Sequence, residues 1–294
     1  MLLSGGGSAL FEKSKISEAL QQDITKKLLS RGANIEEINA VRKRLSLVKG
    51  GKLAAAAYPA RVITIALSDV LSNDKGVIAS GITVCDDTDN ESLYKILQKY
   101  LPDISDDIQK TILTKDDINI NDGGYFFAGD INILCEAAGK KARELGFTVH
   151  HKSRCLSGEA RETAEEILQS IPSLPGKHCF VFGGETVVTL KGDGKGGRNQ
   201  EMALAAAIRL QGKKGIAFVS VGSDGTDGPT GDAGGFSDGN TYFRMKEKGI
   251  DAEKELENNN SNYALKMAGD IITTGPTGTN VNDLTFVLTE NYED

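Results

Sequence analysis

GIAFVSVGSDGTDGPTGDAGG, residues 215–235, runs from an apolar, β-branched segment directly into a loop rich in glycine and aspartate. Such a run predicts a buried strand followed by a long loop at its carboxyl end. In α/β proteins, ligands bind at that end of the strands. Strands alternate with helices elsewhere along the chain, which predicts an α/β fold with a largely parallel sheet.

Amphipathic and apolar segments on both sides of this stretch extend the pattern. Ile16, Leu20, Ile24 and Leu28 are spaced four apart, which predicts a helix with one buried face at about 17–30. Further helices are expected at 35–47, 90–115, 157–171, 201–211 and 262–270, and strands at 62–70, 147–153, 177–184, 185–190 and 284–289.

Two segments predict how the chain divides into domains. IPSLPG at 171–176 contains two of the six prolines and a glycine, and it predicts a boundary between domains at 1–172 and 173–294. LLSGGGSAL at 2–10 reads as the end of a strand, a glycine turn and the start of a helix. A strand usually needs about four to eight residues, so we expect the first domain to be incomplete at its N-terminus.

Composition excludes several classes of partner. The formal net charge is -7 without a basic stripe, so nucleic acid is not an expected partner. No apolar run approaches the roughly 20 residues that span a membrane, and no secretory signal is recognised. The four cysteines form no C-x-x-C pair, which favours reduced thiols in the cytoplasm. A homo-oligomer is left open.

Two segments of the first domain are candidates for anion binding. SGGGS at 4–8 lets backbone N–H groups approach an anion, although a plain tight turn explains the same pattern. The basic stretch at 39–54 is either a solvated helix face or a place to hold a carboxylate or phosphate. The candidate residues are Ser4, Gly5, Gly6, Gly7, Ser8, Arg42, Lys49 and Lys52.

Carboxylates stand at the ends of two predicted strands. Asp69, at the end of 62–70, is a candidate for orienting a hydroxyl group or, alternatively, a turn former. Asp224 and Asp227 lie among the six glycines of 222–235. Oxygen ligands on such a loop favour Mg²⁺, with a purely structural loop as the alternative.

Two more glycine-rich loops are candidates for binding nucleotide or acceptor. GDGKGGRNQ at 192–200 presents Lys195 and Arg198 before a helix, which suits a polyphosphate or is simply a flexible basic loop. We expect TTGPTGTNVND at 273–283 either to contact a nucleotide or sugar acid or to be a connecting turn. GGET at 183–186 lies near the first of these loops in the sequence. The candidate contacts are Gly183 and Glu185 in GGET, Gly196, Gly197 and Asn199 in the first loop, and Thr277 and Asn280 in the second.

Taken together, these motifs resemble one known family. The resemblance is carried by SGGGSAL (4–10), INAVRKRLSLVKGGKLA (38–54), ITIALSDV (63–70), VIASG (77–81), LSGEARE (156–162), GGETVVTLKGDGKGGRNQE (183–201), VGSDGTDGPTGDAGG (221–235) and TTGPTGTNVNDL (273–284). In this order they resemble the glycerate kinases with a MOFRL-type C-terminal domain.

The resemblance implies both a fold and an activity. Members of the family phosphorylate D-glycerate with ATP and a divalent metal, commonly at the 2-hydroxyl, so ATP, Mg²⁺ and 2-phosphoglycerate are expected here. A Rossmann-like domain and a smaller α/β domain would enclose the active site between them. Family knowledge points to Arg198 as functionally important. We expect Arg198 and Lys195 to neutralise phosphate, Asp69 to orient the hydroxyl, and Asp224 and Asp227 to hold Mg²⁺.

The sequence departs from the family pattern in two ways, which keeps alternatives open. The family normally begins with a segment carrying a Gly-Lys motif, which has no counterpart here, and Leu71 and Ile82 stand where the family usually has proline. Some members have been called hydroxypyruvate reductases, but no G-x-G-x-x-G follows a strand in this chain. A truncated, non-catalytic nucleotide-binding protein is the third alternative.

Overall fold

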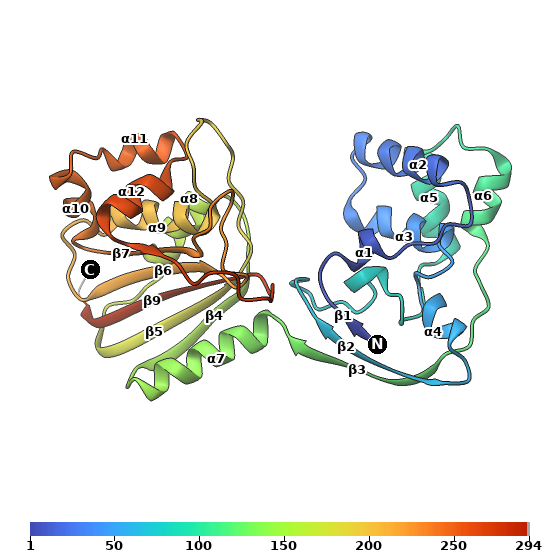
Figure 1. The fold of residues 1–294 in the computed structure, drawn as a ribbon, viewed down its shortest axis with the longest axis horizontal. Coiled ribbons are helices and arrows are strands. Elements are labelled where there is room, and N and C mark those ends of the chain that lie inside the picture. Colours follow the sequence, from blue (N-terminus) through green and yellow to red (C-terminus); the bar gives the residue numbers. More distant parts are fainter. Residues whose placement is uncertain (293–294) are drawn as a thin grey trace. The chain divides into compact units, whose positions relative to one another are not determined.

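The computed structural model describes residues 1–292 and divides the chain into two compact units (Figure 1). Unit 1 is Met1–Ala128, and unit 2 begins at Gly129. Each unit contains its own sheet and helices, which confirms the predicted α/β class. No helix in the described part of the chain combines the length and apolar composition needed to cross a membrane.

Unit 1 contains several helices and a small sheet of order β1-β2-β3. The strands are β1 (Leu2–Leu3), β2 (Arg61–Leu67) and β3 (Asn121–Gly129), and the helices are α1 (Gly7–Leu10), α2 (Glu18–Ser30), α3 (Ile35–Leu45), α4 (Lys52–Ala56), the 3₁₀ turn η1 (Ile78–Ser80), α5 (Asn90–Tyr100) and α6 (Asp106–Leu113). Strand β1 runs parallel to β2 at the edge of the sheet, with Leu2 opposite Ile65. The carboxyl ends of β1 and β2 therefore point the same way.

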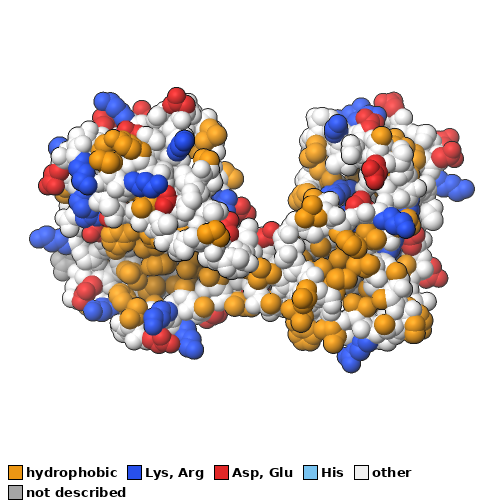
Figure 2. Space-filling view, in the orientation of Figure 1, with side chains coloured by type: hydrophobic (Ala, Val, Ile, Leu, Met, Phe, Trp, Pro, Cys, Tyr) orange, Lys and Arg blue, Asp and Glu red, His pale blue; other side chains and the backbone are white. Residues whose placement is uncertain are grey.

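The core of unit 1 lies among its helices rather than on the sheet. Leu28, Leu45, Leu93, Leu97 and Ile112 are all fully buried there. In contrast, part of the sheet surface is apolar and exposed: Figure 2 shows hydrophobic side chains gathered where Figure 1 has β1 and β2. The exposed residues of these strands include Leu2, Ile63 and Ile65.

Unit 2 is built on a six-stranded mixed sheet of order β4-β5-β9-β6-β7-β8. The strands are β4 (Thr148–Leu156), β5 (Leu174–Gly184), β6 (Ile216–Gly222), β7 (Gly234–Asp238), β8 (Ile271–Ile272) and β9 (Asp283–Tyr292). Among the described strand pairs only β4–β5 is parallel, so the expected largely parallel sheet is wrong for this unit. The segment 185–190, expected as a strand, has only one isolated bridge, between Val187 and Glu159.

Helices cover both faces of this sheet (Figure 1). The helices are α7 (Ile131–Glu144), α8 (Ala160–Gln169), α9 (Arg198–Arg209), α10 (Thr241–Glu247), α11 (Ala252–Glu257) and α12 (Ser261–Ala268). Ile131 and Cys135 of α7 pack against Val181 of β5, whereas Ile167 of α8 and Met202 of α9 pack with Phe180 on the opposite face.

The division between the compact units differs from the predicted boundary at 172/173. Helix α8 shares its core with β5 and α9, and β4 pairs with β5 along its length. These elements, which precede residue 172, therefore belong to unit 2. The prolines of 171–176 mark the entry into β5 instead of a gap between two compact bodies.

Strand β9 lies between β5 and β6 and is antiparallel to both. Its first residue therefore lies at the edge of the sheet where β5 and β6 end, the functional edge. Asp283, the first residue of β9, is paired with Gly184 at the end of β5 and with Gly222 at the end of β6. Gly184 has a φ of 154°, and a Cβ there would lie 2.2 Å from the Leu156 backbone nitrogen. Only glycine allows β4 and β5 to approach so closely at this edge.

The histidine His150 of β4 packs against side chains of β5, and its protonation can report on this packing. Its ring stacks on Phe180 with 4.7 Å between centroids, and its Nε2 lies 3.1 Å from Nδ1 of His178. Burial, and then the charges of His178 and Lys152, lower the pKa of His150. The unfolded chain therefore binds a proton more readily than the folded chain, and we expect stability to fall as pH drops below about 6.5 and through the folded-state pKa.

Two measurements check this expectation. NMR titration of the three histidine rings should place the His150 midpoint below the ordinary histidine value, and His150→Phe should reduce the loss of urea stability between pH 7 and pH 5. A midpoint at the ordinary value, or an unchanged pH dependence in the variant, would show that the ring is not held in this environment.

Candidate functional site

The predicted residues of unit 1 come together at the carboxyl ends of β1 and β2. A cavity of about 240 Å³ is lined by the SGGGS segment, Asn39, Arg42 and Asp69, with apolar walls from Ile35, Val70, Val77, Ile78 and Ala79. A Cβ on Gly5 would lie 2.9 Å from Oδ2 of Asp69, so the glycine backbone lies against this carboxylate. Arg42 Nη2 donates to the Ser8 carbonyl at 2.7 Å, which ties α3 to the rim.

Lys49 and Lys52 do not line this cavity. Lys49 is fully buried, and its Nζ donates to the Phe11 carbonyl at 2.7 Å and lies 3.2 Å from Glu12. Lys52 Nζ donates to the Lys43 carbonyl at 2.6 Å and lies 3.1 Å from Asp116. Burial is the main cause of the lowered pKa of each lysine. Both ammonium groups bind carbonyl and carboxylate groups of other segments of unit 1. The sequence had predicted that they contact a ligand.

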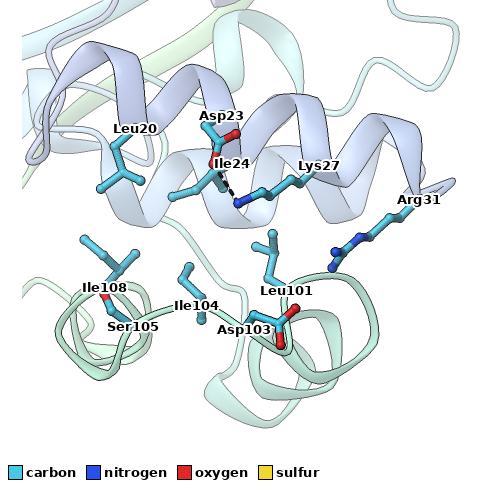
Figure 3. Close-up of a pocket in the computed structure, with 10 residues that line it drawn as sticks. All are labelled: Leu20, Asp23, Ile24, Lys27, Arg31, Leu101, Asp103, Ile104, Ser105 and Ile108. Atoms are coloured by element: carbon cyan, nitrogen blue, oxygen red, sulfur yellow. Dashed lines mark ion pairs between the residues drawn. The ribbon is translucent and has the colours of Figure 1, made fainter.

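A further cavity of unit 1, about 220 Å³, lies between α2 and the segment leading into α6 (Figure 3). Leu20 and Ile24 of α2 lie on one side and Leu101 on the other, and Asp23 and Lys27, also on α2, form an ion pair 2.7 Å long. None of the predicted site residues lines it. Its lining mixes apolar side chains with Asp23, Lys27, Arg31, Asp103 and Ser105, none of which belongs to the motifs that predicted the site.

In unit 2, Arg198 occupies the first turn of α9 at the functional edge of the sheet. Its Nε and Nη2 donate to the two carboxylate oxygens of Asp283 at 2.5 and 3.0 Å, and its Nη1 lies 3.0 Å from Oε1 of Glu185. Burial lowers the pKa of Arg198, but the hydrogen bonds and charge of Asp283 outweigh burial and raise it. The guanidinium is therefore a fixed positive charge, one-third exposed.

The glycine loop before α9 is held in place and is not a flexible cradle of donors. The Lys191 and Gly192 N–H groups donate to Asn259 Oδ1 at 2.7 and 3.1 Å, and the Lys195 N–H donates to Asn260 Oδ1 at 3.1 Å. These three backbone donors are thus already engaged, and the predicted contacts Gly196 and Gly197 lie closely against Ser261 and Asp227. The exposed side chain of Lys195 is what this part of the loop offers to a ligand.

Asp227 closes the start of α9 from the neighbouring loop. Its Oδ1 and Oδ2 accept from the backbone N–H groups of Asn199 and Gln200 at 3.2 and 2.8 Å. The N-cap residue, Gly197, has no side chain to do this, and a Cβ on it would lie 2.3 Å from Oδ1 of Asp227. Burial raises the pKa of Asp227 to about 6, although these hydrogen bonds lower it.

Known proteins are similar to this chain over nearly its whole length. Residues 1–113 match the model described as "Domain of unknown function (DUF4147)", and residues 178–283 match the MOFRL family. The D-glycerate 2-kinase of Thermotoga maritima is 44% identical, over 98% of this chain and 71% of that protein. The chain belongs to the glycerate kinase family. A glycerate kinase of zebrafish, Danio rerio, is 34% identical over 98% of this chain and 70% of that protein.

Solved structures of the glycerate kinase family share the fold. The crystal structure of a glycerate kinase from Thermotoga maritima has a TM-score of 0.90 at 44% identity, covering 98% of this chain and 72% of that one. A protein from Pyrococcus horikoshii gives a TM-score of 0.85 at 40% identity, with 98% and 70% coverage. A "putative hydroxypyruvate reductase" of Agrobacterium vitis is also similar, at 37% identity over 98% of this chain and 78% of that protein.

Among the described residues, the two predicted Mg²⁺ ligands, Asp224 and Asp227, do not belong to a larger cluster of metal-ligating side chains. Within residues 1–292, no group of three or more His, Cys, Asp or Glu side chains is arranged to hold a metal ion. Asp227 uses both of its oxygens to cap α9. Asp224 accepts from the Thr226 N–H at 2.9 Å. Asp227 thus has a structural role at the start of α9, and the assignment of Asp224 and Asp227 as Mg²⁺ ligands stays a prediction.

The other predicted residues of unit 2 divide into structural and peripheral groups. Asn199 is buried and accepts from Ser220 Oγ at 2.6 Å, and a Cβ on Gly183 would lie within 2.7 Å of side-chain atoms of α7. Thr277 Oγ1 donates to the Ser223 carbonyl at 2.6 Å, which ties two loops together. Asn280 is exposed and accepts from the Asn282 N–H at 3.2 Å.

Sequence reasoning missed Asp283 and Asn282. Asn282 donates to Glu185 Oε2 at 3.3 Å, so both residues belong to the cluster around Arg198. The signal was present as the polar pair Asn-Asp directly before the apolar run 284–289. The pair ends the loop 273–283, from which only Thr277 and Asn280 were predicted as contacts.

Proposed function

We propose that this chain transfers the γ-phosphoryl group of ATP to D-glycerate and forms 2-phosphoglycerate. The observation that carries the proposal is Arg198, a partly exposed guanidinium fixed by a buried carboxylate at the functional edge of unit 2. Phosphoryl transfer depends mainly on positioning and charge neutralisation, which such a group supplies. Glycerate 2-kinases 44% and 40% identical over 98% of the chain support the choice of substrate.

The two groups of residues are proposed to serve this single reaction. The SGGGS backbone and Arg42 hold the glycerate carboxylate, and Asp69 accepts the proton as the glycerate hydroxyl oxygen attacks the γ-phosphorus. The bond from phosphorus to the ADP oxygen breaks, and ADP leaves with the electron pair. Arg198 and Lys195 neutralise the phosphoryl oxygens during transfer.

The four cysteines are free thiols, which supports a reducing, cytoplasmic location.

Product analysis tests the proposed function. The protein is incubated with ATP, MgCl₂ and D-glycerate, and ³¹P and ¹H NMR identify the product. We expect ADP and 2-phosphoglycerate in equal amounts, and 3-phosphoglycerate would correct the position of transfer. A parallel incubation with hydroxypyruvate and NADH tests the reductase suggested by the name of the Agrobacterium vitis relative. NADH oxidation, or ATP binding without turnover, would overturn the kinase proposal.

Asp69→Asn should lower kcat for glycerate phosphorylation by about 10²–10⁴-fold, because the amide cannot accept the hydroxyl proton. The melting temperature should change little. Asp122→Asn is a matched control in the same unit, since Asp122 is exposed and only accepts from the Gly124 N–H at 2.8 Å. An Asp69→Asn enzyme as active as this control would remove Asp69 from the mechanism.

A further inference from the structure

We infer that Asp283 is a positioning residue, which aims Arg198 so that one of its terminal nitrogens is left for the transferring phosphoryl group. The inference rests on the proposed kinase function and adds a role that the sequence motifs did not indicate. It is carried by the unequal way in which two carboxylates share the guanidinium.

Asp283 holds two of the three nitrogens in a fork. It contacts Nε at 2.5 Å and Nη2 at 3.0 Å, and it is 6% exposed. Its strand partners on both sides, Gly184 and Gly222, carry no side chains, so space for the carboxylate is built into the sheet. A bidentate contact with a buried carboxylate fixes the plane of a guanidinium as well as its charge.

Glu185 holds the third nitrogen in a different way. It makes one contact to the guanidinium, at Nη1 and 3.0 Å, its other oxygen accepts a long hydrogen bond from Asn282 at 3.3 Å, and its side chain is 46% exposed. It lies just beyond β5, outside any strand. A half-exposed carboxylate in an irregular segment can turn into solvent when a phosphate arrives, whereas Asp283 cannot leave without unpairing a buried charge. The structure thus divides the guanidinium into a held side, Nε and Nη2, and a reacting side, Nη1.

The base of the arginine is fixed as well. Asp227 caps the first turn of α9 through the N–H groups of Asn199 and Gln200. With the backbone and the held side both constrained, little side-chain freedom remains to be lost when phosphate binds. Such preorganisation acts on the rate more than on the affinity, since misplacement of a catalytic group by about 1 Å costs up to roughly 10²-fold.

The test is a double-mutant cycle between Asp283→Asn and Arg198→Ala, with kcat, KM and melting temperature measured for each protein. Asp283→Asn should lower kcat by about 10- to 100-fold and change KM for ATP less than kcat. In the Arg198→Ala background the same change should cause no further loss of kcat, because Asp283 acts through the arginine. Asp283→Glu, which restores the charge, should recover part of the rate.

Asp270→Asn is the matched control. Asp270 is 2.6 Å from Arg244 Nη2, and its side chain, like that of Asp283, is almost wholly buried beside an arginine that is 33% exposed. It should lower the melting temperature without lowering kcat. If Asp283→Asn behaves in the same way, or if its effect on kcat persists without Arg198, the positioning role is wrong.

A measurement independent of turnover separates this inference from the kinase proposal. The Arg198 Nε–H signal in ¹H–¹⁵N NMR should exchange slowly with water in the wild type and in Asp270→Asn, and rapidly in Asp283→Asn. If the wild type does not phosphorylate glycerate, the kinase proposal fails, and this signal decides the positioning role. Slow exchange retained in Asp283→Asn overturns it, and rapid exchange in that variant alone supports it.

Discussion

Arg198→Ala is expected to lower kcat for glycerate phosphorylation by about 10³-fold or more, the lower end of what arginines contribute in other phosphoryl-transfer enzymes. KM for glycerate should change far less, because a guanidinium aimed at the moving phosphoryl group stabilises the transition state more than the bound substrate. Arg198→Lys should restore only part of the rate. A lysine cannot keep the two-point contact with Asp283 while reaching the phosphate.

A purely structural Arg198 predicts a different result. Removing the arginine leaves Asp283 buried without its partner, so some loss of stability accompanies either role. The roles separate when kcat and melting temperature are measured on the wild type, Arg198→Ala and Arg198→Lys at a temperature where all three are folded. An Arg198→Ala enzyme that is less stable yet turns over normally contradicts the catalytic assignment.

Lys49→Met is expected to destabilise unit 1 by about 3 kcal/mol, the lower end for a buried ion pair that loses one partner, since Glu12 keeps some exposure. The ammonium group is inaccessible to solvent and holds both the Phe11 carbonyl and the Glu12 carboxylate. Methionine fills a similar volume but leaves both oxygens without this donor. Urea unfolding followed by circular dichroism gives the change in the free energy of unfolding.

Lys95→Met is the control for this substitution. Lys95 pairs with Glu91 one helical turn away, and both side chains are more than 70% exposed. Such surface pairs contribute about 0.3–0.5 kcal/mol. Equal stabilities for the two variants would mean that Lys49 is not buried as described, and would return it to the list of candidate ligand contacts.

The contrast between Asp69 and Lys49 shows which site features the sequence could predict. Asp69 and SGGGS each follow an apolar strand, and the carboxyl ends of neighbouring parallel strands meet at one edge, so their meeting followed from local pattern. Whether Lys49 faces solvent, a ligand or the interior depends on Phe11 and Glu12, nearly 40 residues away. A cluster of basic residues in the sequence does not show which distant residues will contact each side chain.

Unit 2 shows the same limit at the level of the sheet. The strands at 177–184 and 215–221 were predicted close to their observed positions, but nothing local indicates that β9 runs antiparallel between them. Asp283 therefore joins the site from the start of a strand. For the glycine loop at 192–197, the sequence left open a phosphate-binding loop or a flexible basic loop, and the contacts that hold it come from Asn258, Asn259 and Asn260, more than 60 residues later.

The central place of β9 has a consequence for biosynthesis. Of the described strands it leaves the ribosome last, yet β5 and β6 can form one sheet only through it. Until residues 283–292 emerge, the nascent chain exposes two unpaired apolar strand edges, which chaperones recognise and which aggregate readily. A premature stop codon before residue 283 would remove the strand that joins the sheet together with the carboxylate that aims Arg198, so such fragments should be degraded and not accumulate as inactive enzyme.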